Sequence, residues 1–413
     1  MASRINPFKP NSPAPVGMFA GRADELKLLE GGLNQTKHGE PANFLITGDR
    51  GIGKSSLLLF LDAIAKGDVK GLDGGQFNFV VINLSISDKM NLLTFLKIVE
   101  NNVRREIGKT EVARKFLTDT WSFVQRLRVM DSGIERSEKE QDEEVVLDEF
   151  ASSLADTCNR IVKPINDGEN KKDGILFIVD EADNAIAELR LGYFIKTVTE
   201  DLQKKNCNNV MFVVTGLPET IQKLKASHES SVRAFHPVKI KELLPNDRKW
   251  IVDLGIKKAN DINLDKTSVT EDAKEQISSL SEGYPHFIQQ FAYCAFKQDT
   301  NLVMDSDDVV NSAFADGGAL DSIGNRYYES DFYQKIKSDE YRQVLTIMSD
   351  RMNSWIKKAE IRAEFTGSET KLTNALKALT DRKIILKNNE RDGEYRLQQR
   401  GFALWIQLFG NRK

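Results

Sequence analysis

The sequence predicts an α/β protein built around a doubly wound parallel sheet, and two observations carry this prediction. The first is that short apolar runs, typical of buried strands, alternate with helical patterns over roughly the first 240 residues. The second is that two of these runs, ILFIV and VMFVV, are apolar without interruption, as expected of central parallel strands covered on both faces. After residue 245 the pattern becomes mainly helical, so we expect the sheet to be confined to the first part of the chain.

The chain of 413 residues is long enough for about two to four domains, and its pattern changes at several places. We expect an extended N-terminal strap over 1–18, which is rich in Pro, Asn and Ser. The α/β domain is predicted over 19–245, with an insertion of helix and solvated loop at about 108–144. A helical domain is predicted over 246–335 and a last domain over 336–413.

The last domain has the element order of a winged helix. Three helical segments, DEYRQVLTIMSD, IKKAEIRAEF and SETKLTNALKALTDR, precede two short strands, KIILKNN and YRLQQ, joined by the turn ERDGE. Residues 336–413 hold 16 Lys and Arg against 10 Asp and Glu, a net charge of +6 that leaves −9 for the rest of the chain. Such asymmetry indicates a module that faces nucleic acid, although a solvated helix face can also be basic.

The composition excludes several other classes. With 40% hydrophobic and 29% charged residues, the chain is neither fibrous nor disordered. Its three cysteines have no metal-ligand spacing, and their odd number argues against a disulfide framework, so a reducing cytoplasm is the expected location. The late apolar segment FALWIQLF is too short to cross a bilayer and is expected to pack as a core helix, so no membrane partner is predicted.

A phosphate-binding loop lies between the first predicted strand and the following helix. The segment GDRGIGKS satisfies the pattern G-x-x-x-x-G-K-S in the strand–turn–helix context that the pattern requires. Glycines let backbone N–H groups approach phosphates, Lys54 brings a positive charge to the β and γ phosphates, and Ser55 offers a hydroxyl to Mg²⁺. ATP and Mg²⁺ are therefore the predicted cofactors, held by Gly48, Asp49, Arg50, Gly51, Ile52, Gly53, Lys54, Ser55 and Ser56.

Four further residues are candidates for the chemistry of ATP hydrolysis. Asp180 ends an apolar strand where it can hold Mg²⁺, and Glu181 beside it can orient and deprotonate the attacking water. Alternatively, this acidic pair only caps the next helix. Thr215 at the end of the next strand can sense the γ-phosphate or make local hydrogen bonds alone. Arg233 can act as an arginine finger in a neighbouring subunit's site, or it is an ordinary surface arginine.

The motifs MFAGRADEL, GDRGIGKSS, ILFIVDEAD, VVTGLPE and EGYPHFIQ occur in an order that resembles AAA+ ATPases of the initiator (origin-recognition-like) and STAND type, which includes archaeal ATPases and is often closed by a winged helix. The resemblance implies that Phe19 to Arg22 frame the adenine and that Gly283, Pro285 and His286 lie where the helical lid meets nucleotide. A lid arginine senses the γ-phosphate in many such proteins; here GYPH offers a histidine. The resemblance therefore implies slow, switch-like hydrolysis.

Two functions follow from this resemblance. In the first, the chain forms a homo-oligomer with ATP shared between subunits and binds double-stranded DNA through the winged helix. The side chains expected to contact DNA are Lys371, Lys377, Arg382 and Lys383, followed along the wing by Lys387, Arg391 and Arg396. In the second, the winged helix packs on the core of a STAND-type signalling ATPase, and output passes to a protein effector.

Overall fold

The structure is a computed structural model that describes residues 4–13, 19–131, 139–164, 171–329, 332–333, 336, 338–352, 354–382, 384–388 and 390–410. The chain divides into two compact units. The first, which we call the sheet unit, is Arg22–Lys241. The second, which we call the helical unit, combines Met1–Gly21 with Glu242–Lys413. The sheet unit is thus inserted, in sequence, into the helical unit, and the chain passes between the two units twice.

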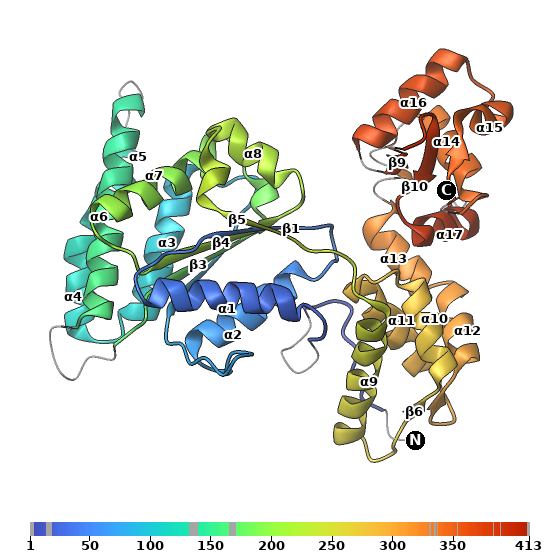
Figure 1. Cartoon of the computed structure of the whole chain (residues 1–413), viewed down its shortest axis with the longest axis horizontal. Helices are drawn as coiled ribbons and strands as arrows, with labels where there is room; N and C mark the ends of the chain where they lie inside the picture. Colours follow the sequence, from blue (N-terminus) through green and yellow to red (C-terminus); the bar gives the residue numbers. More distant parts are fainter. Residues whose placement is uncertain are drawn as a thin grey trace. The chain divides into compact units, whose positions relative to one another are not determined.

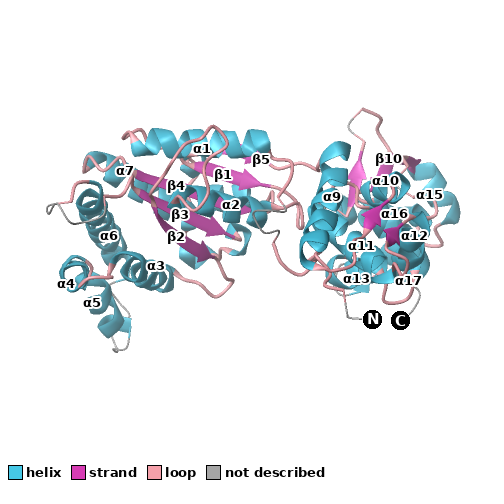
Figure 2. Cartoon of the chain, turned by 90° about the horizontal axis from the view of Figure 1, so that it is seen from below, coloured by secondary structure: helices cyan, strands magenta, loops and turns pink. Residues whose placement is uncertain are grey.

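The sheet unit contains a five-stranded parallel sheet in the order β2-β3-β4-β1-β5 (Figure 2). Its strands are β1 (Phe44–Thr47), β2 (Val80–Ser85), β3 (Ile175–Asp180), β4 (Val210–Gly216) and β5 (His236–Lys239). Every residue of β1 and β4 is buried, because these strands lie inside the sheet and are covered on both faces. The predicted α/β fold with a doubly wound parallel sheet is confirmed.

Helices cover both faces of this sheet (Figure 1). One face, formed by alternate residues of β1 to β4, shares a single apolar core with the helices that follow β2 and surround β3. On the other face Gly32 lies so close to Phe44 that a Cβ would come within 2.3 Å of its ring, so helix and sheet pack tightly there. The helices are α1 (Ala23–Lys37), α2 (Lys54–Lys66), α3 (Leu92–Ile107), α4 (Glu111–Thr120), α5 (Ser122–Asp131), α6 (Lys139–Val162), α7 (Leu191–Lys204) and α8 (Thr220–Ser227).

The predicted insertion contributes to this core more than its sequence indicated. Helices α4 and α5 replace the expected single helix, and Trp121 between them is fully buried against Phe150. The Trp121 indole N–H donates to the hydroxyl of Thr157 at 3.0 Å. The acidic run was expected to be a solvated loop, but α6 begins at Lys139 within it; residues 132–138 lie outside the described part of the chain.

From Glu242 onward, the helical unit contains a helical lid followed by a winged helix. The lid consists of α9 (Pro245–Ile262), β6 (Ser268–Val269), α10 (Glu271–Leu280), α11 (Pro285–Gln298), β7 (Val303–Met304), α12 (Ser306–Phe314) and α13 (Ala319–Tyr327). The winged helix consists of α14 (Asp339–Ser349), β8 (Ile356–Lys357), α15 (Lys358–Glu364), α16 (Glu369–Asp381), β9 (Ile385–Lys387), β10 (Glu394–Leu397) and α17 (Arg400–Phe409). The two-residue strand β8, which pairs with β10, was not predicted. The predicted core helix is α17, whose Trp405 and Phe409 are buried.

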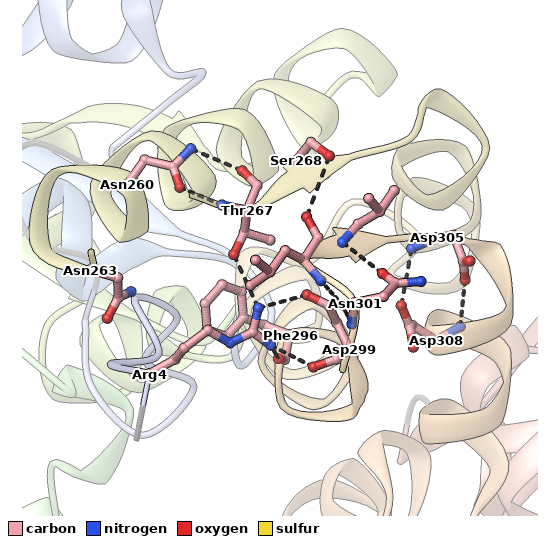
Figure 3. A network of polar contacts seen from close by, with 12 residues as sticks. Arg4, Asn260, Asn263, Thr267, Ser268, Phe296, Asp299, Asn301, Asp305 and Asp308 are labelled. Atoms are coloured by element: carbon pink, nitrogen blue, oxygen red, sulfur yellow. Dashed lines mark hydrogen bonds and ion pairs between the residues drawn. The ribbon is translucent and has the colours of Figure 1, made fainter. Parts of the chain in front are cut away.

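The first described residues are anchored on the lid by a buried polar network (Figure 3). The Arg4 guanidinium donates to the Asp299 carboxylate at 2.8 Å, to the Thr267 hydroxyl at 3.1 Å and to the Phe296 carbonyl at 3.1 Å. It also lies 4.6 Å from the centre of the Phe296 ring. The Asp299 side chain has no exposed surface, so water does not solvate its negative charge. Among the residues drawn in Figure 3, Arg4 is the one cation that pairs with this carboxylate.

No helix in the described part of the chain is long and apolar enough to cross a membrane.

Candidate nucleotide-binding and hydrolysis site

The phosphate-binding loop runs between β1 and α2 and depends on its glycines. Gly51 and Gly53 have φ angles of +78° and +103°, in the left-handed region that favours glycine. A Cβ at Gly48 would lie 3.1 Å from the carbonyl oxygen of Ile240, which leaves no room for a side chain without a shift. The loop therefore requires glycine at three of the positions that the sequence pattern selected.

Lys54 is the first residue of α2 and folds back over the loop. Its Nζ donates to the carbonyl oxygens of Gly48 at 2.8 Å and Asp49 at 3.0 Å. Burial lowers the pKa of Lys54, while the nearby carboxylate of Asp180 acts in the opposite direction. The ammonium group is thus held inside the loop, within reach of an anion that the loop N–H groups would surround.

Asp180 is the centre of the polar contacts at the ends of the strands. Its Oδ2 accepts a hydrogen bond from the Ser55 hydroxyl at 2.9 Å. Its Oδ1 accepts from the Thr215 hydroxyl and from the Glu181 backbone N–H, the latter at 2.8 Å. Parallel pairing of β3 with β4 brings the carboxyl ends of these strands to one edge of the sheet. Three predicted residues from three separate elements therefore meet here.

Glu181 has a backbone conformation that a non-glycine residue rarely adopts. Its φ angle of +57° lies in the left-handed region, a strain that structures retain mainly where it serves a function. Its exposed side chain accepts a hydrogen bond from the Ser85 hydroxyl at 2.7 Å. Ser85 was not predicted as a site residue. Its only sequence signal was a polar residue at the end of an apolar strand, and its pairing in register with Asp180 is seen in the structure alone.

Asp183, the last acid of the DEAD segment, is a second residue that was not predicted. Its Oδ1 accepts from the backbone N–H of Leu217 at 3.0 Å and so ties the segment after β3 to the segment after β4. A Cβ at Gly216 would lie 2.1 Å from the Thr220 hydroxyl, so these segments leave no space at that position.

Metal binding by protein side chains alone is not supported. Across the described residues, no group of three or more His, Cys, Asp or Glu side chains could hold a metal ion. One hydroxyl and one carboxylate, Ser55 and Asp180, do converge beside the loop. This donor set fits Mg²⁺, which usually takes one or two protein oxygens together with phosphate oxygens and water.

Residues 18–190 match the AAA ATPase domain family. This part of the chain is an AAA ATPase domain. The match supports the ATPase activity that the resemblance predicted for this segment. The family match ends before Thr215 and Arg233, so the AAA domain assignment itself says nothing of these two residues.

Solved structures extend the likeness to the whole chain. The ORC2 protein of Aeropyrum pernix in its ADPNP–ADP complexes is 14% identical, with a TM-score of 0.55 and 98% of each chain covered. At this identity the likeness shows a shared fold. Cdc6p of Pyrobaculum aerophilum is 13% identical (TM-score 0.46, 97% of each chain), and the Aeropyrum pernix ORC1 protein in complex with DNA is 14% identical (TM-score 0.43, 95% of this chain and 93% of that one). No curated protein is significantly similar in sequence.

Two other predicted residues lie in the sheet unit with the AAA domain motifs. Arg22 precedes α1 with a φ angle of +80°, and its guanidinium donates to the carbonyl oxygen of Ile52 in the loop at 3.1 Å. Arg233 lies in a short 3-10 helix, Ser231–Ala234, just before the edge strand β5. Its side chain is exposed and makes no hydrogen bond or ion pair with any residue that the structure describes.

The remaining nucleotide candidates, Phe19, Pro285 and His286, belong to the helical unit. Pro285 is the first residue of α11 and fits a helix start, because it has no N–H to leave unsatisfied. His286 is largely buried beside the rings of Phe287 and Tyr327. Its Nε2 has no hydrogen-bond partner among the described residues. Burial, with a smaller contribution from the charge of Arg326, lowers the pKa of His286 to about 4.

The predicted DNA-contacting residues lie on α16 and on the β9–β10 hairpin, and their environments differ. Lys377 and Arg391 are exposed. Lys371 pairs with Glu340 at 2.6 Å and Lys387 with Asp392 at 2.7 Å. Arg382 lies 5.9 Å from the centre of the Tyr341 ring, and Arg396 lies 4.8 Å from that of Trp355. Lys383 lies outside the described residues.

Proposed function

We propose that this ATPase is an ATP-dependent DNA-binding switch, in which the AAA domain binds and slowly hydrolyses ATP and the winged helix binds double-stranded DNA. The observation that carries the proposal is the convergence of the Ser55, Asp180 and Thr215 side chains beside the phosphate-binding loop, in a chain that ends in a basic winged helix.

ATP binding rests on the loop and on Lys54. The backbone N–H groups of the loop surround the phosphates, and Lys54 exchanges its hydrogen bonds to Gly48 and Asp49 for phosphate oxygens. Ser55 and Asp180 would hold Mg²⁺, which neutralises phosphate charge when it is bound. Arg22 keeps the loop in place through its hydrogen bond to the carbonyl oxygen of Ile52.

Lys54→Ala tests this arrangement. We expect ATP affinity measured by calorimetry to fall roughly 100-fold, because a charge-assisted contact to phosphate is lost. Lys66→Ala, at the other end of α2, is the matched control and should bind ATP as the wild type does. Equal ATP affinity of Lys54→Ala and the control would remove Lys54 from the site.

Hydrolysis depends on Glu181. Its carboxylate accepts a proton from the attacking water as the new bond to the γ-phosphorus forms and the bond to the β–γ bridging oxygen breaks, with ADP and phosphate as products. The Ser85 hydroxyl fixes the orientation of this carboxylate at 2.7 Å. Thr215 and the Glu181 N–H fix Asp180 in the same way, so both acids are oriented before ATP arrives.

In a homo-oligomer, Arg233 of one subunit would bring a positive charge to the phosphates bound by its neighbour. Arg233 is exposed beside an edge strand and is available to reach a phosphate bound by a neighbouring subunit. Arg233→Ala keeps its own phosphate-binding loop, and Lys54→Ala keeps its own Arg233. A mixture of these two inactive variants should therefore regain part of the ATPase activity. A mixture as inactive as either variant alone would argue against a shared site.

DNA binding rests on α16 and the hairpin. The exposed face of α16 carries Thr373, Asn374 and Lys377, side chains that can hydrogen-bond to base edges. Arg391 is exposed in the turn between β9 and β10, in the position of a wing. The ion pairs of Lys371 and Lys387 lie at the surface, where such pairs contribute little and can exchange for phosphate contacts.

Fluorescence anisotropy of labelled duplex DNA over a salt series tests DNA binding by the winged helix. The double variant Lys377→Glu, Arg391→Glu should bind at least about tenfold more weakly and reduce the slope of log K against log salt by about 2. The control Lys257→Glu, Lys297→Glu makes the same charge change on exposed lid positions and should keep the wild-type slope. Equal losses in both variants would mean that charge alone, not this face, attracts DNA.

A second candidate function is a STAND-type signalling ATPase that acts through a protein effector. It is favoured by the close packing of α17 on lid helix α13, where a Cβ at Gly324 would lie 1.8 Å from the Trp405 ring. A winged helix held in this way can serve as a packing module. Wild-type protein that binds no duplex at low salt, with ATP or without it, would support this candidate over the first.

A further inference from the structure

The turn at Glu282 and Gly283, between α10 and α11, is held in one conformation from several sides. Both residues have positive φ angles, +51° and +85°. A Cβ at Gly283 would lie 2.8 Å from the carbonyl oxygen of Leu243, and the Gly283 carbonyl accepts from the Leu243 N–H at 2.9 Å. Arg248 donates to the Leu243 carbonyl at 2.7 Å and to the Ser278 carbonyl at 3.1 Å. The turn and Leu243 are therefore fixed to each other.

Leu243 lies directly after the point where the chain leaves the sheet unit. Just before this point, the Ile240 N–H donates to the carbonyl oxygen of Thr47 at 2.8 Å, at the start of the phosphate-binding loop. The other passage between the units reaches the same places: a Cβ at Gly21 would lie 2.6 Å from the Leu243 side chain, and Arg22 donates to the loop at Ile52. The loop is thus linked to the Gly283 turn by two routes, each of which begins with a hydrogen bond to the loop and continues along the covalent chain between the units.

On its other side, the turn contacts the last helix of the winged helix. The Glu282 carboxylate accepts a hydrogen bond from the Gly401 N–H at 2.7 Å, at the N-terminus of α17. Gln399, the residue at the N-cap position, makes no side-chain cap hydrogen bond. Helix N-termini expose unsatisfied N–H groups and partial positive charge, which a carboxylate stabilises. Burial raises the pKa of Glu282, and the N–H groups of Gly401 and Arg400 oppose this rise.

A second contact between the lid and α17 runs beside this cap. Phe287, close to the turn, packs edge-to-face on Tyr328 with 6.4 Å between ring centres. Tyr328 is buried, lies 4.9 Å from the Phe402 ring and donates its hydroxyl hydrogen to Gln399 at 2.9 Å. The turn and α17 are therefore joined by the Glu282 carboxylate, which caps the helix N-terminus, and by a row of aromatic contacts that runs from Phe287 through Tyr328 to Phe402.

We propose that the Glu282–Gly283 turn couples the phosphate-binding loop to the winged helix, with Glu282 as the positioning residue that makes α17 follow the turn. The proposal builds on the proposed function, in which the loop holds ATP and the winged helix gives the output. Its physical basis is that every link is a hydrogen bond or a packed contact within one unit, or the covalent chain between units.

Hydrogen exchange of the full-length protein tests the coupling without DNA. In the wild type, ATP in place of ADP should change the exchange rate of α17 amides by about fivefold or more. Glu282→Ala should expose the Gly401 amide, raise its exchange about tenfold and abolish the response to nucleotide, with ATP affinity kept within about twofold. Glu282→Gln retains an acceptor oxygen and should restore the response. Glu275→Ala on exposed α10 is the matched control and should respond as the wild type does.

Two results would overturn the proposal. The first is a wild-type protein in which α17 amides exchange at the same rate with ATP and with ADP. The second is a Glu282→Ala variant in which the Gly401 amide is exposed but α17 exchange still responds fully to nucleotide. If Glu282→Ala does not fold, Glu282→Asp, whose shorter side chain withdraws the carboxylate, takes its place with the same outcomes. The ratio of DNA affinities with ATP and ADP is a separate measurement. Absence of DNA binding would refute the proposed DNA function, while the response of α17 would still decide the coupling.

Discussion

The sheet unit and the helical unit hold their key side chains by contacts of different range. In the sheet unit, the site is assembled from strand ends that the parallel sheet aligns, and each motif is a short continuous segment. In the helical unit, the decisive contacts join Arg4 to Asp299 and Glu282 to Gly401, which are 295 and 119 residues apart. The residues proposed for ATP binding and hydrolysis therefore lie in short continuous segments, whereas the contacts that would transmit the nucleotide state join residues far apart in the sequence.

We expect substitutions in the sheet unit to have the largest effect on the rate of ATP hydrolysis. Glu181→Gln should lower kcat of ATP hydrolysis by roughly 10² to 10⁴, because the carboxylate that accepts the proton is lost, and should leave ATP affinity unchanged. Steady-state phosphate release together with calorimetry measures both quantities. Glu188→Gln, an exposed glutamate shortly after it, is the control. A Glu181→Gln variant as active as this control would place the base elsewhere.

A change in the helical unit should instead alter stability and spare the nucleotide. Arg4→Ala leaves the buried Asp299 carboxylate without its charged partner, with only the N–H groups of Asn301 and Leu302 donating to it, and should lower the free energy of unfolding by about 3–5 kcal/mol. The first transition in thermal unfolding should move accordingly, while ATP affinity stays close to that of the wild type. Lys9→Ala, on the exposed surface of the same segment, should change neither. Loss of ATP binding in Arg4→Ala would mean that this ion pair also supports the nucleotide site.

The pH dependence of stability should also originate in the helical unit. The pKa of His286 is about 4 in the folded chain and near 6.5 when unfolded, so the unfolded state binds the proton first as the pH falls. Its contribution is complete above pH 6.5 and is lost between pH 6.5 and about 4, at a cost of about 3 kcal/mol. Urea unfolding at several pH values should show this loss in the wild type. His286→Phe should lack that part of the slope, and an unchanged slope would contradict the assignment.

The smallest predicted effect concerns Thr215, which only orients Asp180. Thr215→Val keeps the shape of this fully buried side chain and removes its hydroxyl, while the Glu181 N–H still holds the same carboxylate oxygen. We expect kcat to fall roughly tenfold with little change in ATP affinity. Thr199→Val on α7, away from the strand ends, serves as the control. A loss as large as that of Glu181→Gln would give Thr215 a direct role in the chemistry.

Much of the sheet unit could be predicted because its signals are contiguous. The loop, the strand that ends at Asp180 and the strand that carries Thr215 near its end each occupy one uninterrupted segment, and a parallel sheet aligns strand ends whatever the strand order. Ser85 escaped prediction because its role depends on β2 lying next to β3, which no local pattern reveals. The Arg4 network and the Glu282 cap escaped for the same reason, since each requires a tertiary contact between remote residues.

The Arg4–Asp299 ion pair also affects the order of events during synthesis. Residues 4–13 leave the ribosome before the sheet unit, but Asp299 follows Arg4 by 295 residues. At about 5–20 residues per second, Arg4 is without its partner for roughly 15–60 s. The sheet unit, continuous from Arg22 to Lys241, is fully made within that interval. Folding on the ribosome should therefore complete the nucleotide-binding sheet first, and the earliest residues of the chain should be among the last to reach their native positions.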